Sequence, residues 1–336
     1  MILLCGIVSE TSLAMVADAL QRRGIEHIVV NQRHVRQLTA ELVLDDAGLG
    51  GRLTGPGYHV DLAEVTAVYL RLMDDRWLPE LEGEPPQSPA RITGRGLHEL
   101  LGQWADVTPA RVVNRYAAMG SNFSKPYQLQ LIREHGFAVP ETLVTNDPGR
   151  LLAFRAAHGP LIYKSISSER SIVGQLDEHD TARIERIRWC PVQFQVFVPG
   201  PNLRVHTVGD EVFATLIHTE AVDYRYAVRQ TGCAPAFTRY DPGDELAERC
   251  VSLAAALGLE VAGLDLKLAP DGRIVCLEVN PSPVFSYYQL RTGQPIADAI
   301  ARLLNKDLRQ GHPAPAITKD STSADYHREE VEKYTF

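Results

Sequence analysis

The sequence lacks the features on which several common functions depend. It has 34 Lys and Arg against 42 Asp and Glu, so it offers no excess of positive charge for nucleic acid or an anionic membrane. No apolar run approaches the roughly 20 residues that span a bilayer. The first residues, MILLCGIVSE, carry neither the basic segment nor the cleavage site of a signal peptide and are typical of a strand. We therefore expect a cytoplasmic protein without a nucleic-acid or membrane partner.

Motifs of several enzyme classes are also missing. The five cysteines form no CxxC pair, which argues against a zinc site or a disulfide framework. The 11 histidines show no HxH or HExxH pattern, so metal-hydrolase chemistry has no support. There is no GxSxG nucleophile elbow, the commonest hydrolase signal. The chemistry must come from other residue types.

The composition is that of a globular protein, with 45% apolar and 23% charged residues, and the length suggests two or three compact units. Residues 2–8 form a continuous apolar run, as in a strand buried on both faces. Helical spacing follows until Gly24, and a second apolar run occupies 25–30. This β-α-β order predicts a small parallel α/β domain, residues 1–113. Short strands with glycine-rich turns are expected at 41–62.

Strands and helices alternate after residue 114, which predicts a mixed α/β (α+β) chain. We expect a helix from a Ser124 N-cap to Gly136 and a hairpin turning at Gly209 and Asp210. Further helices are expected near 91–105, 148–158, 178–188, 243–257 and 296–304. Further strands are expected at 111–114, 140–145, 160–166, 192–198, 260–269 and 273–279. The polar segment 306–336 has no hydrophobic periodicity and is expected to be a mobile tail.

The best candidate site lies in the last two predicted strands. Glu278 and Asn280 are two residues apart and therefore share one face of a strand. If the PDG turn closes a hairpin, Asp265 lies beside them. Two carboxylates and an amide oxygen suit Mg²⁺ held against phosphates. The alternative is that these side chains merely face solvent, which fits poorly because Leu277 and Val279 alternate with them.

Several cations extend this pattern. Lys164 stands in an apolar strand, where an ammonium needs an anion, and a nucleotide phosphate would serve. The Ser-rich segment 165–174 that follows could offer N–H and hydroxyl groups to phosphates, although it lacks a GxxxxGKS/T motif. Lys125, Arg204 and Arg225 each have a simpler alternative, a surface salt bridge.

Taken in order, these segments resemble the ATP-grasp ligases, in the branch that contains ribosomal-protein glutamate ligases and graspetide (microviridin-type) peptide cyclases. The resemblance rests on SKPYQLQLIREHGFAVPETLVTNDP, CPVQFQVFVPGPNLRVHTVGDEVFA, IHTEAVDYR, LDLKLAPDGRIVCLEVNPSP and TGQPIADAIARLL. It implies an ATP-grasp fold behind an N-terminal parallel-sheet pre-ATP-grasp domain. The central and C-terminal ATP-grasp subdomains would then be residues 114–198 and 199–305.

The resemblance also assigns nucleotide contacts. Lys125 and Lys164 match the two lysines that contact phosphates from either side. Gln195 and Val196 match the hinge that faces adenine, with Gln193 close by. One further position, Asn202, stands where related ligases often have an aspartate on the ribose.

The remaining matches concern the reacting groups. Arg204 and Arg225 match positions that contact the γ-phosphate or the acyl phosphate. Asp265, Glu278 and Asn280 match the Mg²⁺ ligands, so ATP and Mg²⁺ are the expected cofactors.

The resemblance implies a carboxylate ligase that forms an amide or ester through an acyl phosphate. A graspetide-type macrocyclase acting on a ribosomal precursor peptide is preferred, although the first domain has no segment assignable to leader recognition. One alternative joins an amino acid or amine to a small-molecule or protein carboxylate. Another is a nucleotide-binding regulator without turnover, against which the complete set of metal ligands argues. A homodimer stays open.

Overall fold

Four sheets organise the part of the chain that the structure, a computed structural model, describes: residues 1–46, 48–166 and 173–306. Residues 1–306 form one compact unit. The expectations for the 165–174 loop and the 306–336 tail fall almost entirely outside the described residues. In the described ranges, no helix combines the length and the apolar character needed to cross a membrane.

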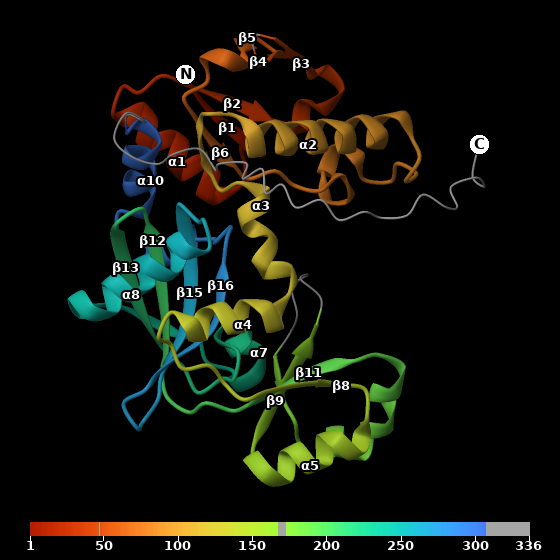
Figure 1. Cartoon of the computed structure of the whole chain (residues 1–336), viewed down its shortest axis with the longest axis vertical. Helices are drawn as coiled ribbons and strands as arrows, with labels where there is room; N and C mark the ends of the chain where they lie inside the picture. Colours follow the sequence, from red (N-terminus) through yellow and green to blue (C-terminus); the bar gives the residue numbers. More distant parts are fainter. Residues whose placement is uncertain (47, 167–172, 307–336) are drawn as a thin grey trace, which may run out of the picture. The chain divides into compact units, whose positions relative to one another are not determined.

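The N-terminal sheet is parallel and confirms the predicted β-α-β opening (Figure 1). Its strands lie in the order β2-β1-β6-β7. They are β1 (Ile2–Gly6), β2 (His27–Asn31), β6 (Ala67–Leu70) and β7 (Arg111–Val113). Helices α1 (Thr11–Arg22) and α2 (Pro89–Val107) belong to this part, and α2 confirms the helix expected near 91–105.

Residues 39–61 confirm the short strands expected at 41–62 and correct the expected role of one glycine-rich stretch. They form an antiparallel sheet of β3 (Thr39–Asp45), β4 (Gly48–Gly55) and β5 (Tyr58–Asp61). The glycine-rich GLGGRLTG is thus a strand rather than a turn. A Cβ at Gly51 would collide with the Glu41 carbonyl oxygen, so glycine is what allows the two strands to approach.

The central antiparallel sheet has the order β10-β9-β11-β8. Its strands are β8 (Thr142–Thr145), β9 (Leu161–Ser165), β10 (Gly174–Gln175) and β11 (Val192–Val196), with α5 (Pro148–His158). The single helix expected at 178–188 is instead two short ones, α6 (Glu178–Ala182) and a 3₁₀ segment (Ile184–Trp189).

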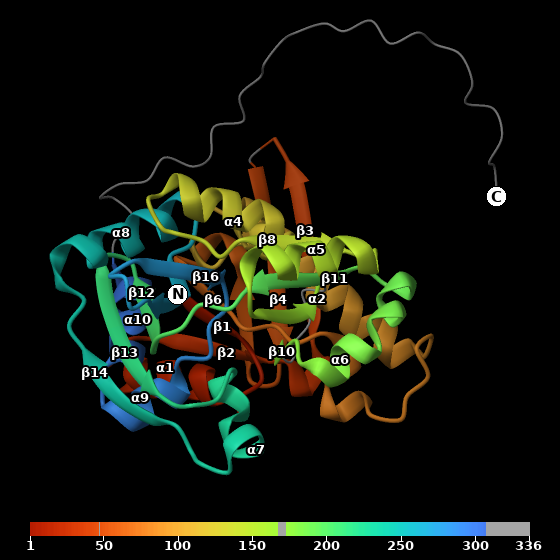
Figure 2. The ribbon, with the colours of Figure 1, turned by 90° about the horizontal axis from the view of Figure 1, so that it is seen from below.

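The C-terminal antiparallel sheet has the order β14-β13-β12-β15-β16. Figure 2 labels β12, β13, β14 and β16. Its strands are β12 (Asn202–Val208), β13 (Glu211–His218), β14 (Ala236–Tyr240), β15 (Val261–Leu268) and β16 (Ile274–Asn280). Val208 pairs with Glu211, which confirms the two-residue hairpin turn. The pairing of β15 with β16 confirms the second hairpin. Strand β14 was not predicted.

Two helices cover one face of this sheet. Leu129 and Ile132 of α4 (Lys125–Glu134) and Leu253 of α8 (Gly243–Ala256) pack against Leu264 and Val279. Helix α4 is also tied to β16, because the Gln128 amide donates to the Val279 carbonyl and accepts from its N–H. The Ser124 side chain makes no capping hydrogen bond, contrary to the expectation.

The remaining helices are α3 (Tyr116–Met119), α7 (Ala227–Thr231), α9 (Ser286–Thr292) and α10 (Ile296–Asn305). Ile300 and Leu304 of α10 share a core with Leu13 and Leu20 of α1 and with Val208 at the end of β12. Farther from α10, the same sheet face carries several polar side chains, among them Arg204 and Asp265, and the candidate site lies there.

Candidate active site

A row of polar side chains crosses the C-terminal sheet. The registers pair Thr215 with Arg204, Arg204 with Asp265, and Asp265 with Glu278. Leu203, Val205 and Leu264 alternate with them and belong to the α4 and α8 core. Side chains on a strand alternate between the two faces, so the row points the other way. The expected proximity of Asp265 and Glu278 is confirmed.

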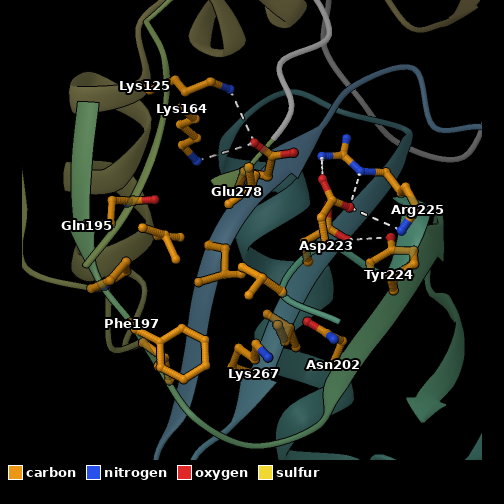
Figure 3. A pocket seen from close by; sticks show the side chains of 18 of the residues that line it. Lys125, Lys164, Gln195, Phe197, Asn202, Asp223, Tyr224, Arg225, Lys267 and Glu278 are labelled. Atoms are coloured by element: carbon orange, nitrogen blue, oxygen red, sulfur yellow. Dashed lines mark hydrogen bonds and ion pairs between the residues drawn. The ribbon is translucent and has the colours of Figure 1, made fainter. Parts of the chain in front are cut away.

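Glu278 lies between the two predicted phosphate lysines (Figure 3). Its Oε2 is 3.2 Å from Lys125 Nζ and 3.9 Å from Lys164 Nζ. Burial disfavours the charged carboxylate, but the two lysines outweigh it and lower the pKa of Glu278 to about 2. Burial lowers the pKa of Lys164, and Glu278 partly offsets this. The anion that Lys164 requires is therefore already present in the protein.

Asp265 is held by three donors. Arg204 Nη1 lies 2.6 Å from Oδ2, Asn280 Nδ2 lies 3.2 Å from the same oxygen, and Tyr224 Oη lies 3.4 Å from Oδ1. Burial disfavours the charged guanidinium, but Asp265 outweighs it and raises the pKa of Arg204. Burial and Asp265 raise the pKa of Tyr224 well above its usual value, so this hydroxyl is a donor at neutral pH.

Apart from Arg204, these side chains border a cavity of about 320 Å³ between the central and C-terminal sheets. Nine of the eleven residues predicted from sequence line it: Lys125, Lys164, Gln195, Val196, Asn202, Arg225, Asp265, Glu278 and Asn280. Arg204 and Gln193 do not. The Arg204 guanidinium donates to Asp265 without lining the cavity itself. Its contact with a phosphate stays a prediction.

Arg225 points to the cavity from the segment after β13 (Figure 3). Its Nε and Nη2 donate to the two carboxylate oxygens of Asp223, at 2.8 and 2.6 Å. These hydrogen bonds, against the opposing effect of burial, raise the pKa of Arg225. A bidentate pair fixes the plane of the guanidinium. Asp223 therefore orients Arg225, a role the sequence analysis did not assign.

Other residues of the site were missed as well. Tyr224 Oη lies 2.7 Å from Tyr288 Oη on α9, a helix that was not predicted. Lys267 lines the cavity opposite Asn202, and its Nζ donates to the Gly200 carbonyl at 2.8 Å. Its position two residues after Asp265 was the available signal.

The donor set fits Mg²⁺. Asp265, Glu278 and Asn280 offer two carboxylates and one amide oxygen, the hard ligands this ion prefers. Asn280 Nδ2 faces both carboxylates, 3.2 Å from Asp265 Oδ2 and 3.5 Å from Glu278 Oε1, so the amide would have to turn its oxygen toward them to share an ion. Throughout the described residues, no three His, Cys, Asp or Glu side chains are grouped to hold a metal, so the predicted set would depend on the Asn280 amide oxygen as its third ligand.

Residues 124–304, more than half of the chain, match the RimK-like ATP-grasp domain. The chain belongs to this family. A probable alpha-L-glutamate ligase of Sodalis glossinidius (strain morsitans) is 33% identical over 199 residues, 55% of this chain and 62% of that protein. A probable alpha-L-glutamate ligase of Alkalilimnicola ehrlichii is 26% identical over 245 residues, 70% of this chain and 79% of that protein.

Solved structures of similar fold cover the N-terminal part too. The macrocyclase MdnC of Microcystis aeruginosa MRC, bound to the precursor peptide MdnA, matches with a TM-score of 0.76 and 21% identity, over 90% of this chain and 99% of MdnC. The ATP-grasp ligase PsnB, in complex with a minimal precursor, Mg and ADP, matches with a TM-score of 0.74 and 29% identity, over 90% and 96%. The expected fold, ligase class and use of ATP and Mg²⁺ by this ATP-grasp family are confirmed.

Replacement of Lys164 tests its predicted contact with the phosphates of ATP. We expect Lys164→Met to weaken ATP affinity by about tenfold, the value of one charge-assisted hydrogen bond. The apo protein should lose little stability, because Lys125 still pairs with Glu278 and the cost of burying Lys164 disappears. Calorimetric titration and thermal unfolding measure the two effects, with the exposed Arg188→Met as control. Unchanged ATP affinity would make Lys164 a purely structural residue.

Acid stability tests the ion pairs of Glu278. The pKa of Glu278 falls from 4.5 to about 2 on folding. Its contribution to the free energy of unfolding is therefore complete above pH 4.5 and is lost as the pH falls toward 2. Urea unfolding at a series of pH values should show this loss. The free energy of unfolding of Glu278→Gln should be lower than that of the unchanged protein at neutral pH. It should also fall less steeply as the pH is lowered into the acid range. Parallel curves for the two proteins would contradict the assignment.

Proposed function

We propose that this protein is a graspetide-type macrocyclase, which joins a side-chain carboxylate of a precursor peptide to an amine or hydroxyl of the same peptide. The carboxylate attacks the γ-phosphate of ATP, which gives an acyl phosphate and ADP. The amine or hydroxyl then attacks the acyl carbon, and phosphate leaves as the amide or ester forms. The likeness to PsnB, with 29% identity over 90% of the chain, carries this proposal.

The residues of the cavity suit these steps. Lys125 and Lys164 neutralise phosphate oxygens, and Arg225, oriented by Asp223, meets charge that develops during transfer. Mg²⁺ bound by Asp265, Glu278 and Asn280 would neutralise the phosphates. No side-chain nucleophile is required, which agrees with the absence of the usual nucleophile motifs.

A second candidate is supported by the sequence relatives, which are named probable alpha-L-glutamate ligases. In this version the phosphorylated carboxylate is attacked by the amino group of a free amino acid. The cavity chemistry is the same, so the two candidates differ in the group that attacks the acyl phosphate.

Mass spectrometry of an ATP-dependent reaction separates the two. With a precursor peptide, macrocyclisation should remove the mass of one water for each linkage. Transfer of an amino acid should instead add one residue mass to the acceptor. ATP-dependent addition of free glutamate, with no dehydrated peptide, would contradict the macrocyclase proposal.

A further inference from the structure

The parallel N-terminal sheet has a topological switch point between β1 and β6. From β1 the chain passes through α1 to β2 on one side, whereas β6 lies on the other side. In open parallel sheets, the crevice beyond the carboxyl ends of such strands takes ligands. Glu10 follows β1 and Arg71 follows β6. A Cβ at Gly6 would lie 2.7 Å from the Arg71 carbonyl oxygen, so glycine permits this close approach.

A segment of the C-terminal part contacts the switch point. Arg71 Nη1 donates to Ser282 Oγ at 3.0 Å and to the Pro283 carbonyl at 3.1 Å. Its Nη2 lies 3.0 Å from Glu10 Oε1. The Arg71 side chain is only 9% exposed, so both sets of partners are held in one fixed geometry.

The same segment has a second tether. The Asn114 side-chain amide donates to the Pro281 carbonyl and to the Val261 carbonyl, and its oxygen accepts from the N–H of Glu260. Residues 281–283 are therefore held from both the N-terminal sheet and the start of β15. They directly follow Asn280, the last residue of β16.

We propose that Arg71 is a positioning residue for Asn280, and that the N-terminal domain thereby sets the geometry of the metal site. The inference rests on the proposed role of Asn280 as a metal ligand. Asn280 is the last residue of its strand and pairs with Gly263 on one side only, so the tethers on residues 281–283 fix the chain that leaves it. Residues that hold a metal ligand in place typically change metal affinity 10- to 100-fold when replaced.

The test is calorimetric binding of ADP with and without Mg²⁺, on the full chain. In Arg71→Met we expect unchanged ADP affinity without Mg²⁺. The factor by which Mg²⁺ increases ADP affinity should be about tenfold smaller than in the unchanged protein. Ser282→Ala removes a single acceptor and should give a smaller shift in the same direction. Arg111→Met is the matched control, because Arg111 also joins the N-terminal sheet to a distant segment, through the Leu303 and Lys306 carbonyls.

The outcomes are distinct. A weakened Mg²⁺ dependence in Arg71→Met and Ser282→Ala, but not in Arg111→Met, supports the inference. If Arg71→Met and Arg111→Met lower the melting temperature alike while both keep the Mg²⁺ dependence, Arg71 is only structural and the inference is overturned. If Arg71→Met does not fold, Ser282→Ala decides. Absence of any Mg²⁺-dependent ADP binding in the unchanged protein would overturn the proposed metal site itself.

Discussion

Glu278→Gln is expected to lower kcat by about 1,000-fold or more, since it removes a proposed metal ligand and the negative charge that pairs with two lysines. The amide keeps the shape of the side chain but not its negative charge. Lys125 and Lys164 would then repel each other, and the proposed Mg²⁺ site would keep a single carboxylate, Asp265.

ATP consumption with an active substrate measures this effect, and circular dichroism checks the fold. Glu211→Gln is the control, because Glu211 pairs with Arg302 at an exposed position on the same sheet. A kcat within tenfold of the unchanged protein would mean that Glu278 is not essential to the metal site.

The second large effect is expected from a single methyl group. Gly263 lies on β15 opposite Asn280 in the register. A Cβ there would collide with the Arg204 guanidinium and lie 2.7 Å from the Pro283 Cβ. Gly263→Ala must therefore displace the group that holds Asp265 or the segment that follows Asn280. We expect a loss of about 1–3 kcal/mol in unfolding free energy and about 100-fold in kcat, as for misplaced catalytic groups.

Chemical denaturation and steady-state kinetics test both numbers. Gly96→Ala provides the control, since Gly96 lies within α2 and an added Cβ there would meet open space. Alanine there should stabilise the helix by about 0.5–1 kcal/mol and leave kcat unchanged. Full activity of Gly263→Ala would show that the Asp265 and Asn280 geometry tolerates the displacement.

Sequence patterns predicted elements whose signals are local. The period-two spacing of Glu278 and Asn280 placed both on one face, and the GlyAsp turn fixed the hairpin of β12 and β13. Weak or mixed local signals failed. The glycines of β4 suggested turns, yet pairing with both neighbours made it a strand, because cross-strand contacts outweigh intrinsic propensity.

The sequence by itself determined the family, the parallel N-terminal sheet and nine of the residues around the cavity. Strand alternation and motif order are local patterns that can be recognised in the linear sequence. Only the tertiary structure decided what those residues contact. In the folded protein, Lys164 pairs with the Glu278 carboxylate, and Arg204 donates a hydrogen bond to Asp265. Arg71 contacts the segment that follows Asn280. These contacts join residues up to 212 positions apart, and pairings at such distance depend on how sheets pack rather than on any local pattern.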